Sequence, residues 1–142
     1  MHNSIATRVC LANRGIQVST ICPVCLQGPE TIIHVLRDCS LASSCWQNLG
    51  VNLGADFFFL DSREWLEEYG RLEYEAGSLL EYGRLEYEAG SLLIFWNVIF
   101  SFGLWSLWQH QNRVVFQNRP LNQAIHSEVI KRAAEYFFCA YN

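Results

Sequence analysis

The 142-residue sequence predicts a mostly α-helical fold, in which a small N-terminal module stapled by a metal ion precedes a helical C-terminal part. Three observations lead to this prediction. Cysteine and histidine residues follow one another at short spacings between residues 22 and 39. Apolar residues recur at helical spacing over residues 91–116 and again over 122–139. Hydrophobic residues make up 51% of the chain and charged residues 17%, which indicates a folded core rather than disorder.

The candidate metal ligands are Cys22, Cys25, His34 and Cys39. The first two thiols are separated by Pro and Val, so one tight turn can present both of them to the same point. Three sulfurs and one imidazole form a set that Zn²⁺ binds tetrahedrally, and a site filled by four protein ligands is structural. The pattern therefore predicts a zinc-stapled Cys-Cys-His-Cys module. Cys45 is an alternative fourth ligand in place of the histidine.

Six cysteines also permit disulfides. The first 20 residues, however, contain two arginines and no apolar core of a signal peptide. This favours an intracellular protein, nuclear or cytoplasmic and not secreted, in which clustered cysteines more often bind metal. We expect Cys10 and Cys139 to be buried apolar residues outside the site.

The chain before the module shows a short helix followed by an extended segment. Residues 4–14 are expected to be helical, with Ser4 as the N-cap and Gly15 as the stop. Residues 16–21 should then run extended toward the first cysteine.

The second half of the metal loop should be helical over residues 30–37. On an ideal helix Cys39 lies about 140° around the axis from His34, so the helix must end before Cys39 for both to reach one ion. We expect Cys39 to fold back toward the metal. A short helix capped by Ser40 should follow and reach Leu49.

The next segment joins the module to the C-terminal part. The apolar run at residues 57–60 is expected to be a buried anchor. Asp61 or Ser62 should then cap a helix that includes Trp65 and Leu66.

Residues 68–80 and 81–93 both read EYGRLEYEAGSLL. We interpret this tandem repeat as a duplication tolerated in a surface segment; the alternative is an interaction arm. The expected organisation is therefore a metal module over residues 1–55, a linker or helix carrying the duplication over 56–93, and a helical hairpin over 94–142.

The C-terminal hairpin is expected to consist of one buried helix over residues 91–116 and a second over 122–139. The Asn-Arg-Pro sequence at residues 118–120 breaks the helical pattern, and so short a connection favours antiparallel packing. Residues 92–108 are the most apolar stretch, and a membrane anchor there is an alternative at the lower limit of length.

A small polar cluster, formed by His110, Asn112 and Arg113, follows the apolar part of the long helix. It has two interpretations: a contact with phosphate or RNA, or the solvated last turn of a helix, which favours cations. The second is preferred. We expect His2, His110 and His126 to lie on solvent faces or at chain ends, without a role.

The net charge of −4 and the scattered cations disfavour strong non-specific binding to DNA. The chain also lacks the sequence motifs of a catalytic metal or nucleophile site. We therefore expect no enzymatic activity and no small-molecule substrate.

The segments IATRVCLANRGI, CPVC and PETIIHVLRDCSLASSCW resemble the reverse-transcriptase zinc-binding domain of plant non-LTR retrotransposon polyproteins. The later segment FWNVIFSFGLWSLWQHQNRVVFQ is similar to the region that trails this domain in such polyproteins. The resemblance implies a Zn²⁺ ion on the four candidate ligands, a contact with RNA or DNA, and the polymerase portion of the polyprotein as a partner. It also implies that the domain is truncated at its N-terminus. The alternative is a structural or protein-interaction remnant without an activity of its own.

Overall fold

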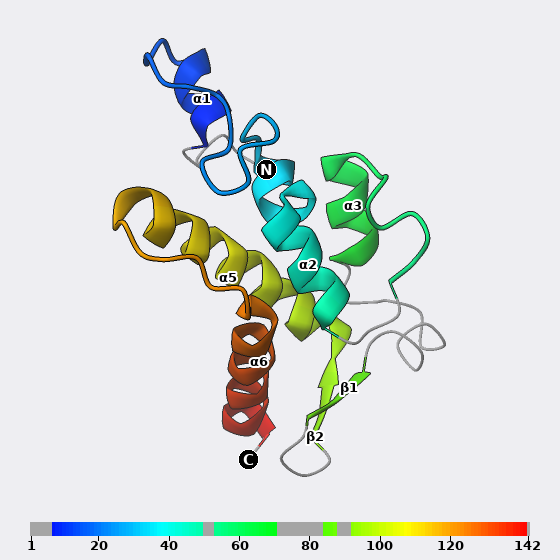
Figure 1. The fold of residues 1–142 in the computed structure, drawn as a ribbon. Coiled ribbons are helices and arrows are strands. Elements are labelled where there is room, and N and C mark those ends of the chain that lie inside the picture. Colours follow the sequence, from blue (N-terminus) through cyan, green and yellow to red (C-terminus); the bar gives the residue numbers. More distant parts are fainter. Residues whose placement is uncertain (1–6, 50–52, 71–83, 88–91, 142) are drawn as a thin grey trace.

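The computed structural model describes residues 7–49, 53–70, 84–87 and 92–141 (Figure 1). Within these residues the protein is mostly helical, as predicted. In chain order the elements are α1 (Arg8–Asn13), a π-helical turn η1 (His34–Asp38), α2 (Ser40–Asn48), α3 (Ser62–Tyr69), β1 (Arg84–Tyr87), β2 (Leu92–Phe95), α5 (Trp96–Phe116) and α6 (Ile125–Tyr141).

Helix α1 is shorter than the sequence suggested. Its N-cap is Thr7, whose side chain accepts a hydrogen bond from the Cys10 N–H, so the expectation of Ser4 as the cap was wrong. The predicted stop is confirmed: Gly15 has φ +85°, and the amides of Gly15 and Ile16 bond back to the carbonyls of Ala12 and Leu11. That pair of bonds is a Schellman motif, which favours glycine in the left-handed position.

The core is built around Trp46 of α2, whose indole is fully buried. Its ring centroid lies 5.4 Å from that of Phe100 and 5.5 Å from that of Phe57, with two further tryptophan rings 6.0 and 6.1 Å away. The indole N–H donates to the Leu36 carbonyl at 2.8 Å. One aromatic side chain thus joins the N-terminal module to the loop before α3 and to α5.

The predicted apolar anchor at residues 57–60 is only partly buried. Phe57 is fully buried, whereas Phe59 is 86% exposed, because the loop turns there and its side chains point in different directions. The cap of α3 is confirmed as Asp61, which accepts a hydrogen bond from the Glu64 N–H at 2.8 Å.

Before α5 the chain forms a two-stranded antiparallel hairpin, which the sequence did not predict. β1 pairs with β2 in the register Arg84↔Phe95 to Tyr87↔Leu92. The long helix therefore begins at Trp96, and the expectation of a helix from residue 91 was wrong. Residues 71–83 and 88–91, which contain most of the duplication, lie outside the described residues.

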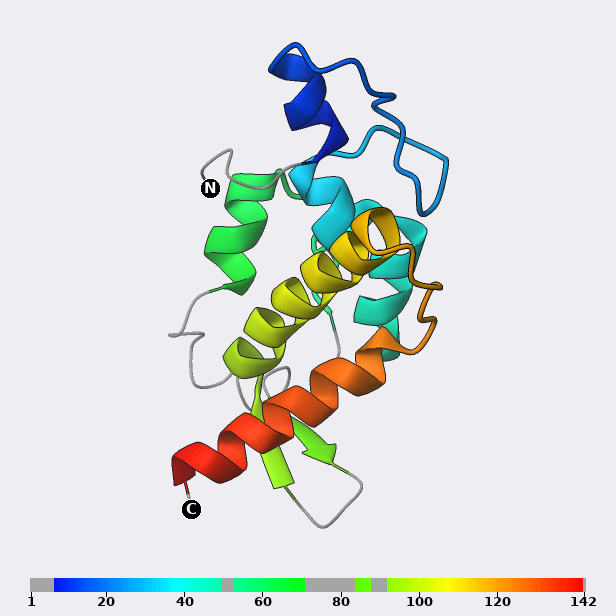
Figure 2. The ribbon, with the colours of Figure 1, turned by 90° about the vertical axis from the view of Figure 1, so that its left-hand side faces the viewer.

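Helices α5 and α6 pack together in opposite directions, as predicted (Figure 2). Residues later in α5 contact residues earlier in α6: the Phe102 ring lies near that of Tyr136, the Ser106 hydroxyl accepts a hydrogen bond from Arg132, and Arg113 pairs with Glu128. Among the helices that the structure describes, none has the length and hydropathy required for a transmembrane span.

Two details of this C-terminal pair differ from expectation. α6 begins at Ile125 rather than at Asn122, whose side chain accepts a hydrogen bond from the Ala124 N–H instead. His110 is only 5% exposed, so its predicted place on a solvent face was wrong. It faces the connection between α5 and α6, where its Nε2 accepts the Asn122 N–H at 2.9 Å.

Candidate metal centre

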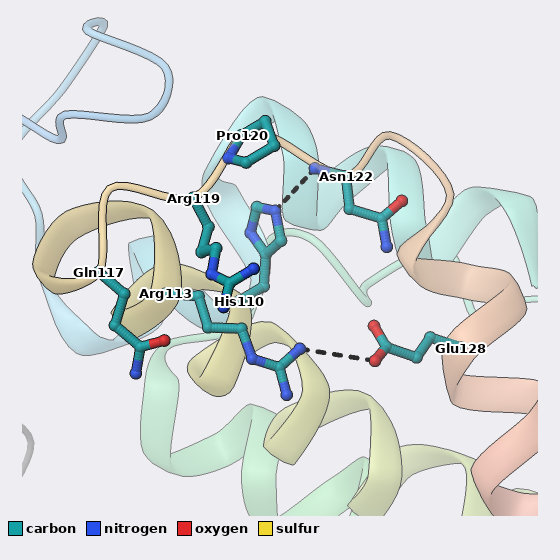
Figure 3. Close-up of a pocket in the computed structure, with 7 residues that line it drawn as sticks. All are labelled: His110, Arg113, Gln117, Arg119, Pro120, Asn122 and Glu128. Carbon is teal, nitrogen blue, oxygen red and sulfur yellow. Dashed lines mark hydrogen bonds and ion pairs between the residues drawn. The ribbon is translucent and has the colours of Figure 1, made fainter.

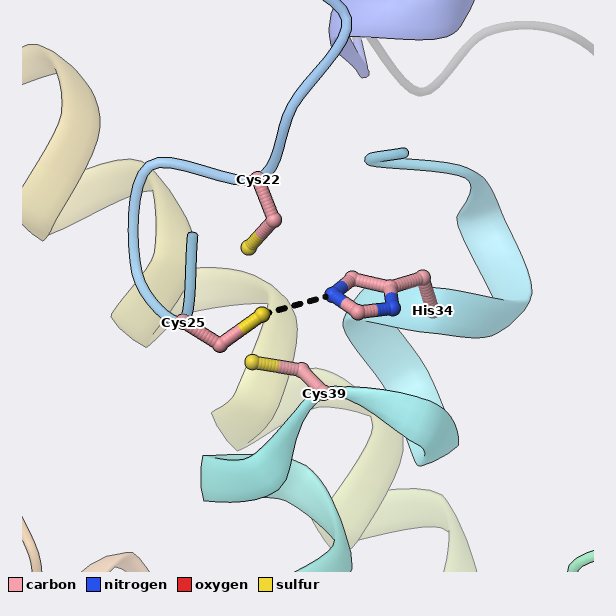
Figure 4. Close-up of side chains that lie close together, drawn as sticks. All are labelled: Cys22, Cys25, His34 and Cys39. Carbon is pink, nitrogen blue, oxygen red and sulfur yellow. Dashed lines mark hydrogen bonds between the residues drawn. The ribbon is translucent and has the colours of Figure 1, made fainter. Parts of the chain in front are cut away.

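The first two predicted ligands lie on a tight loop whose ends are joined by an isolated bridge between Ile21 and Pro29. The Cys22 N–H donates to the Gly28 carbonyl at 2.8 Å, and the Leu26 N–H donates back to the Cys22 carbonyl at 2.9 Å. These backbone bonds curl the Cys-Pro-Val-Cys segment around one point. Both sulfurs consequently face the interior of the loop (Figure 4).

The other two predicted ligands are brought together by η1. The Cys39 N–H donates to the His34 carbonyl at 2.7 Å, an i to i−5 bond that closes a π-helical turn. The chain then leaves the helix, as predicted, because Cys39 has the extended conformation φ −57°, ψ 141°. Cys39 rather than Ser40 is the residue that precedes the first turn of α2, so the expected cap was wrong.

The four side chains form one cluster. Their ligand atoms all lie within 4.8 Å of one another, and the Cys25 Sγ lies 3.2 Å from the His34 Nε2. Around a tetrahedral zinc with bonds of about 2.3 Å, two sulfurs stand ~3.8 Å apart. The donor set and its spread therefore fit a zinc ion after small side-chain adjustments.

The thiols and the imidazole influence one another's protonation. The pKa of Cys22 is lowered to about 3, chiefly because the Cys39 thiol donates a hydrogen bond to its sulfur, while burial opposes the shift. The same bond, together with burial, raises the pKa of Cys39. Hydrogen bonding to Cys22 raises the pKa of His34. Zinc binds thiolates and neutral imidazole, so metal binding would release the protons that these side chains carry.

A second layer of polar contacts surrounds the cluster, and it was not predicted from the sequence. Glu30 is 3% exposed and accepts hydrogen bonds from the Arg8 N–H at 2.8 Å and from the Gln111 Nε2 at 2.7 Å. The same amide nitrogen of Gln111 lies 3.9 Å from the Cys22 Sγ. Burial raises the pKa of Glu30, with the hydrogen bonds opposing. Helix α5 therefore contacts the cluster directly, although its residues lie far away in the sequence.

The remaining cysteines that the structure describes lie outside the cluster. Cys45 is 3% exposed on α2 and is not one of the four clustered residues; burial raises the pKa of its thiol to about 12. Its position therefore does not favour the alternative in which it replaces His34. Cys10 is half-buried, less than expected, and the side chain of Cys139 lies outside the described part.

Fold and site together define a small helical protein with a Cys₃His metal module at its N-terminal end. Residues 1–46 match the family model described as zinc-binding in reverse transcriptase. The match includes all four clustered side chains and confirms the predicted resemblance to a reverse-transcriptase zinc-binding domain. The Cys₃His donor set suits Zn²⁺, in line with the description of that family. No curated protein and no solved structure matches the chain significantly.

Proposed function

We propose that this chain is a non-enzymatic zinc-binding module of a retrotransposon reverse-transcriptase polyprotein, with one structural zinc ion held by Cys22, Cys25, His34 and Cys39. The observation that carries the proposal is the convergence of the four ligand atoms within 4.8 Å of one another, inside the segment that matches the family. Four protein ligands fill a tetrahedral site and leave no position for a reactive water.

Metal analysis of the purified protein tests the site. We expect about one zinc per chain, because four soft ligands make one closed site. Cys22→Ser and His34→Ala should each lower the zinc content. Cys45→Ser is the matched control, since it changes a buried thiol outside the cluster and should leave the zinc content intact. Metal-free wild-type protein, or equal loss in the control, would contradict the assignment.

Chelation tests the structural role. A metal that links two loop cysteines to the π turn should hold residues 16–49 in place, because forming such a site is coupled to local folding. We expect hydrogen exchange in this region to accelerate after zinc removal. Exchange that stays unchanged would show that the ion does not stabilise the module.

The proposed role of the module is a contact with RNA or DNA next to the polymerase portion of the polyprotein. The support is the match to a domain of reverse transcriptases; with a net charge of −4, the contact must be local rather than spread over the surface. Fluorescence anisotropy with a labelled single-stranded oligonucleotide at low salt tests it. Zinc-loaded protein that binds no oligonucleotide would leave a structural or protein-interaction role.

A further inference from the structure

A cavity of about 490 Å³ opens at the connection between α5 and α6, separate from the cysteine cluster (Figure 3). Seven residues line it: His110, Arg113, Gln117, Arg119, Pro120, Asn122 and Glu128. The lining is therefore polar, with two guanidinium groups and one imidazole. Its volume is in the range of sites that hold small molecules or parts of larger ones.

His110, one of the residues that line the cavity, has an imidazole nitrogen without a hydrogen-bond partner. Its Nε2 accepts the Asn122 N–H at 2.9 Å, so in the neutral ring the proton resides on Nδ1. That Nδ1 is buried and has no hydrogen-bond partner among the described residues, although the residue is only 5% exposed. Burial lowers the pKa of His110, which favours the neutral ring. A buried N–H without a partner is uncommon and calls for an acceptor.

Positive charge exceeds negative charge around the cavity. The carboxylate of Glu128 lies 3.6 Å from Arg113 and 3.1 Å from Arg132, so it is shared between two guanidinium groups. Arg119 forms no ion pair with any residue in the part of the chain that the structure describes. The one carboxylate that lines the cavity is thus already neutralised, and the charge of Arg119 is left over.

The backbone fixes where this extra charge lies. Asn118 has φ +51°, a left-handed conformation that reverses the chain after α5. The Arg119 N–H then donates to the Arg113 carbonyl at 3.0 Å, which ties the two arginines together through the main chain. The first turn of α6, which contains Glu128, also lines the cavity, and the N-terminal end of a helix favours anions.

We propose that this cavity receives a phosphate group of a nucleic-acid strand, with Arg113, Arg119 and the Nδ1–H of His110 as donors. Guanidinium groups match the geometry of phosphate oxygens, and a neutral imidazole N–H adds a directed hydrogen bond. The space beyond a single phosphate accommodates the adjoining sugar, next to Gln117 and Pro120. This inference deepens the proposed nucleic-acid contact, on which it rests, and gives it a location outside the zinc module.

The test compares two exposed arginines on the zinc-loaded protein. Anisotropy titrations with a labelled single-stranded RNA over a range of salt concentrations are made for wild type, Arg119→Gln and Arg63→Gln. Losing one phosphate contact should lower the slope of log affinity against log salt by about 0.7 for a single strand. We expect this change, with weaker binding at low salt, for Arg119→Gln only. Arg63 is the matched control because it is an exposed arginine of α3, already paired with Glu67.

The outcomes separate this inference from the function it builds on. If wild-type protein binds RNA and both variants behave alike, the cavity is not the site, while the nucleic-acid contact stands. If zinc-loaded wild-type protein binds no RNA, both are wrong. As an independent readout, the His110 Nδ1–H resonance should shift on adding the oligonucleotide, and a resonance that stays in place at saturation would overturn the proposal.

Discussion

At the scale of single residues, the packing of Trp46 against α5 depends on a glycine, because no side chain fits between them. A Cβ placed on Gly103 of α5 would lie 2.4 Å from Cη2 and 2.8 Å from Cζ3 of Trp46. The indole therefore lies directly against the backbone of α5. This contact fixes how the long helix sits on the N-terminal module.

Gly103→Ala should consequently destabilise the protein, by about 1–3 kcal/mol for overpacking against a gain of roughly 1 kcal/mol in helix propensity. Denaturant unfolding measures the difference. The partner is tested by a double-mutant cycle: in a Trp46→Phe background the clashing atoms are gone, so the penalty should shrink. An alanine that costs the same in both backgrounds would show that the indole is not the obstacle.

His110 gives a pH dependence at the same scale. Burial lowers its pKa in the folded protein below the ordinary value of 6.5. The unfolded chain then binds more protons below pH 6.5, so this residue's contribution to stability is complete above that pH and is lost as pH falls toward the folded pKa. His110→Gln should lose less stability than wild type between pH 7.5 and 5.5.

Urea unfolding of zinc-saturated samples at the two pH values provides the comparison, because any loss of zinc affects both proteins alike. Identical slopes of stability against pH would show that His110 is not the titrating group. The burial of His110 was not predicted from the sequence, because the residue follows the apolar part of the long helix and was expected to be exposed to solvent.

The cysteine cluster and its surroundings illustrate what a sequence reveals at this scale. The four clustered residues were predictable because they lie within 18 positions of the sequence, at short spacings that are typical of a zinc site. The contacts of Glu30 and Gln111 were not, because they join residues 81 positions apart, and only the packing of α5 on the module brings them together.

At the scale of elements, η1 explains how two ligands five residues apart meet. An α-helical turn would separate His34 from Cys39 by about 140°, which is why the sequence predicted a break. The structure ends the helix there, but first widens its last turn, so that the Cys39 amide bonds to the His34 carbonyl. The spacing of His34 and Cys39 showed that the regular helix must end between them, but it did not show that a π turn would bring them together.

The same turn positions the loop before α3 through a buried arginine. Arg37 is 5% exposed; its guanidinium pairs with Asp38 at 2.7 Å, donates to the Leu60 carbonyl at 2.6 Å and lies 5.6 Å from the Trp65 ring centroid. Arg37 thus connects η1 to the loop before α3 and to Trp65 of that helix.

Arg37→Ala should cost about 1–3 kcal/mol, because it leaves the carbonyl oxygens of Phe57 and Leu60 without their donor, whereas the exposed carboxylate of Asp38 is solvated by water. The control is Arg63→Ala, whose exposed pair with Glu67 should be worth about 0–0.5 kcal/mol. Thermal unfolding of both variants provides the measurement. A shift of similar size for the two arginines would mean that the buried contacts contribute no more than a surface pair.

Boundaries of elements were harder to predict than their existence. The apolar residues of β2 and α5 form one continuous run, LLIFWNVIF, so periodicity alone extends the helix back through the strand. Residues 92–95 form a strand because they pair with β1, and the hydrophobic pattern of β2 alone does not reveal this pairing. By contrast, the stop at Gly15 was predicted correctly, and Asp61 is one of the two caps that the sequence offered for α3, because the effect of such residues is local.

At the scale of the whole molecule, the two copies of the duplication contribute different elements to the part of the chain that the structure describes. The first copy, residues 68–80, begins with the last two residues of α3. The second copy, residues 81–93, contains β1 and the first half of β2. A single copy followed by Ile94 and Phe95 would therefore contain every residue type that the end of α3 and the hairpin require.

Deleting residues 81–93 tests whether the fold needs both copies. In the shortened chain EYG ends α3, RLEY replaces β1, and LLIF restores β2 directly before Trp96. Because shortening a connection lowers its closure entropy, we expect a melting temperature equal to or slightly above that of wild type, and an unchanged zinc content. The control is a deletion of the same length over residues 84–96, which removes the LLIF sequence and Trp96, a residue only 3% exposed, and should unfold the core. Equal destabilisation by both deletions would show that the second copy has acquired contacts of its own, as an interaction arm would.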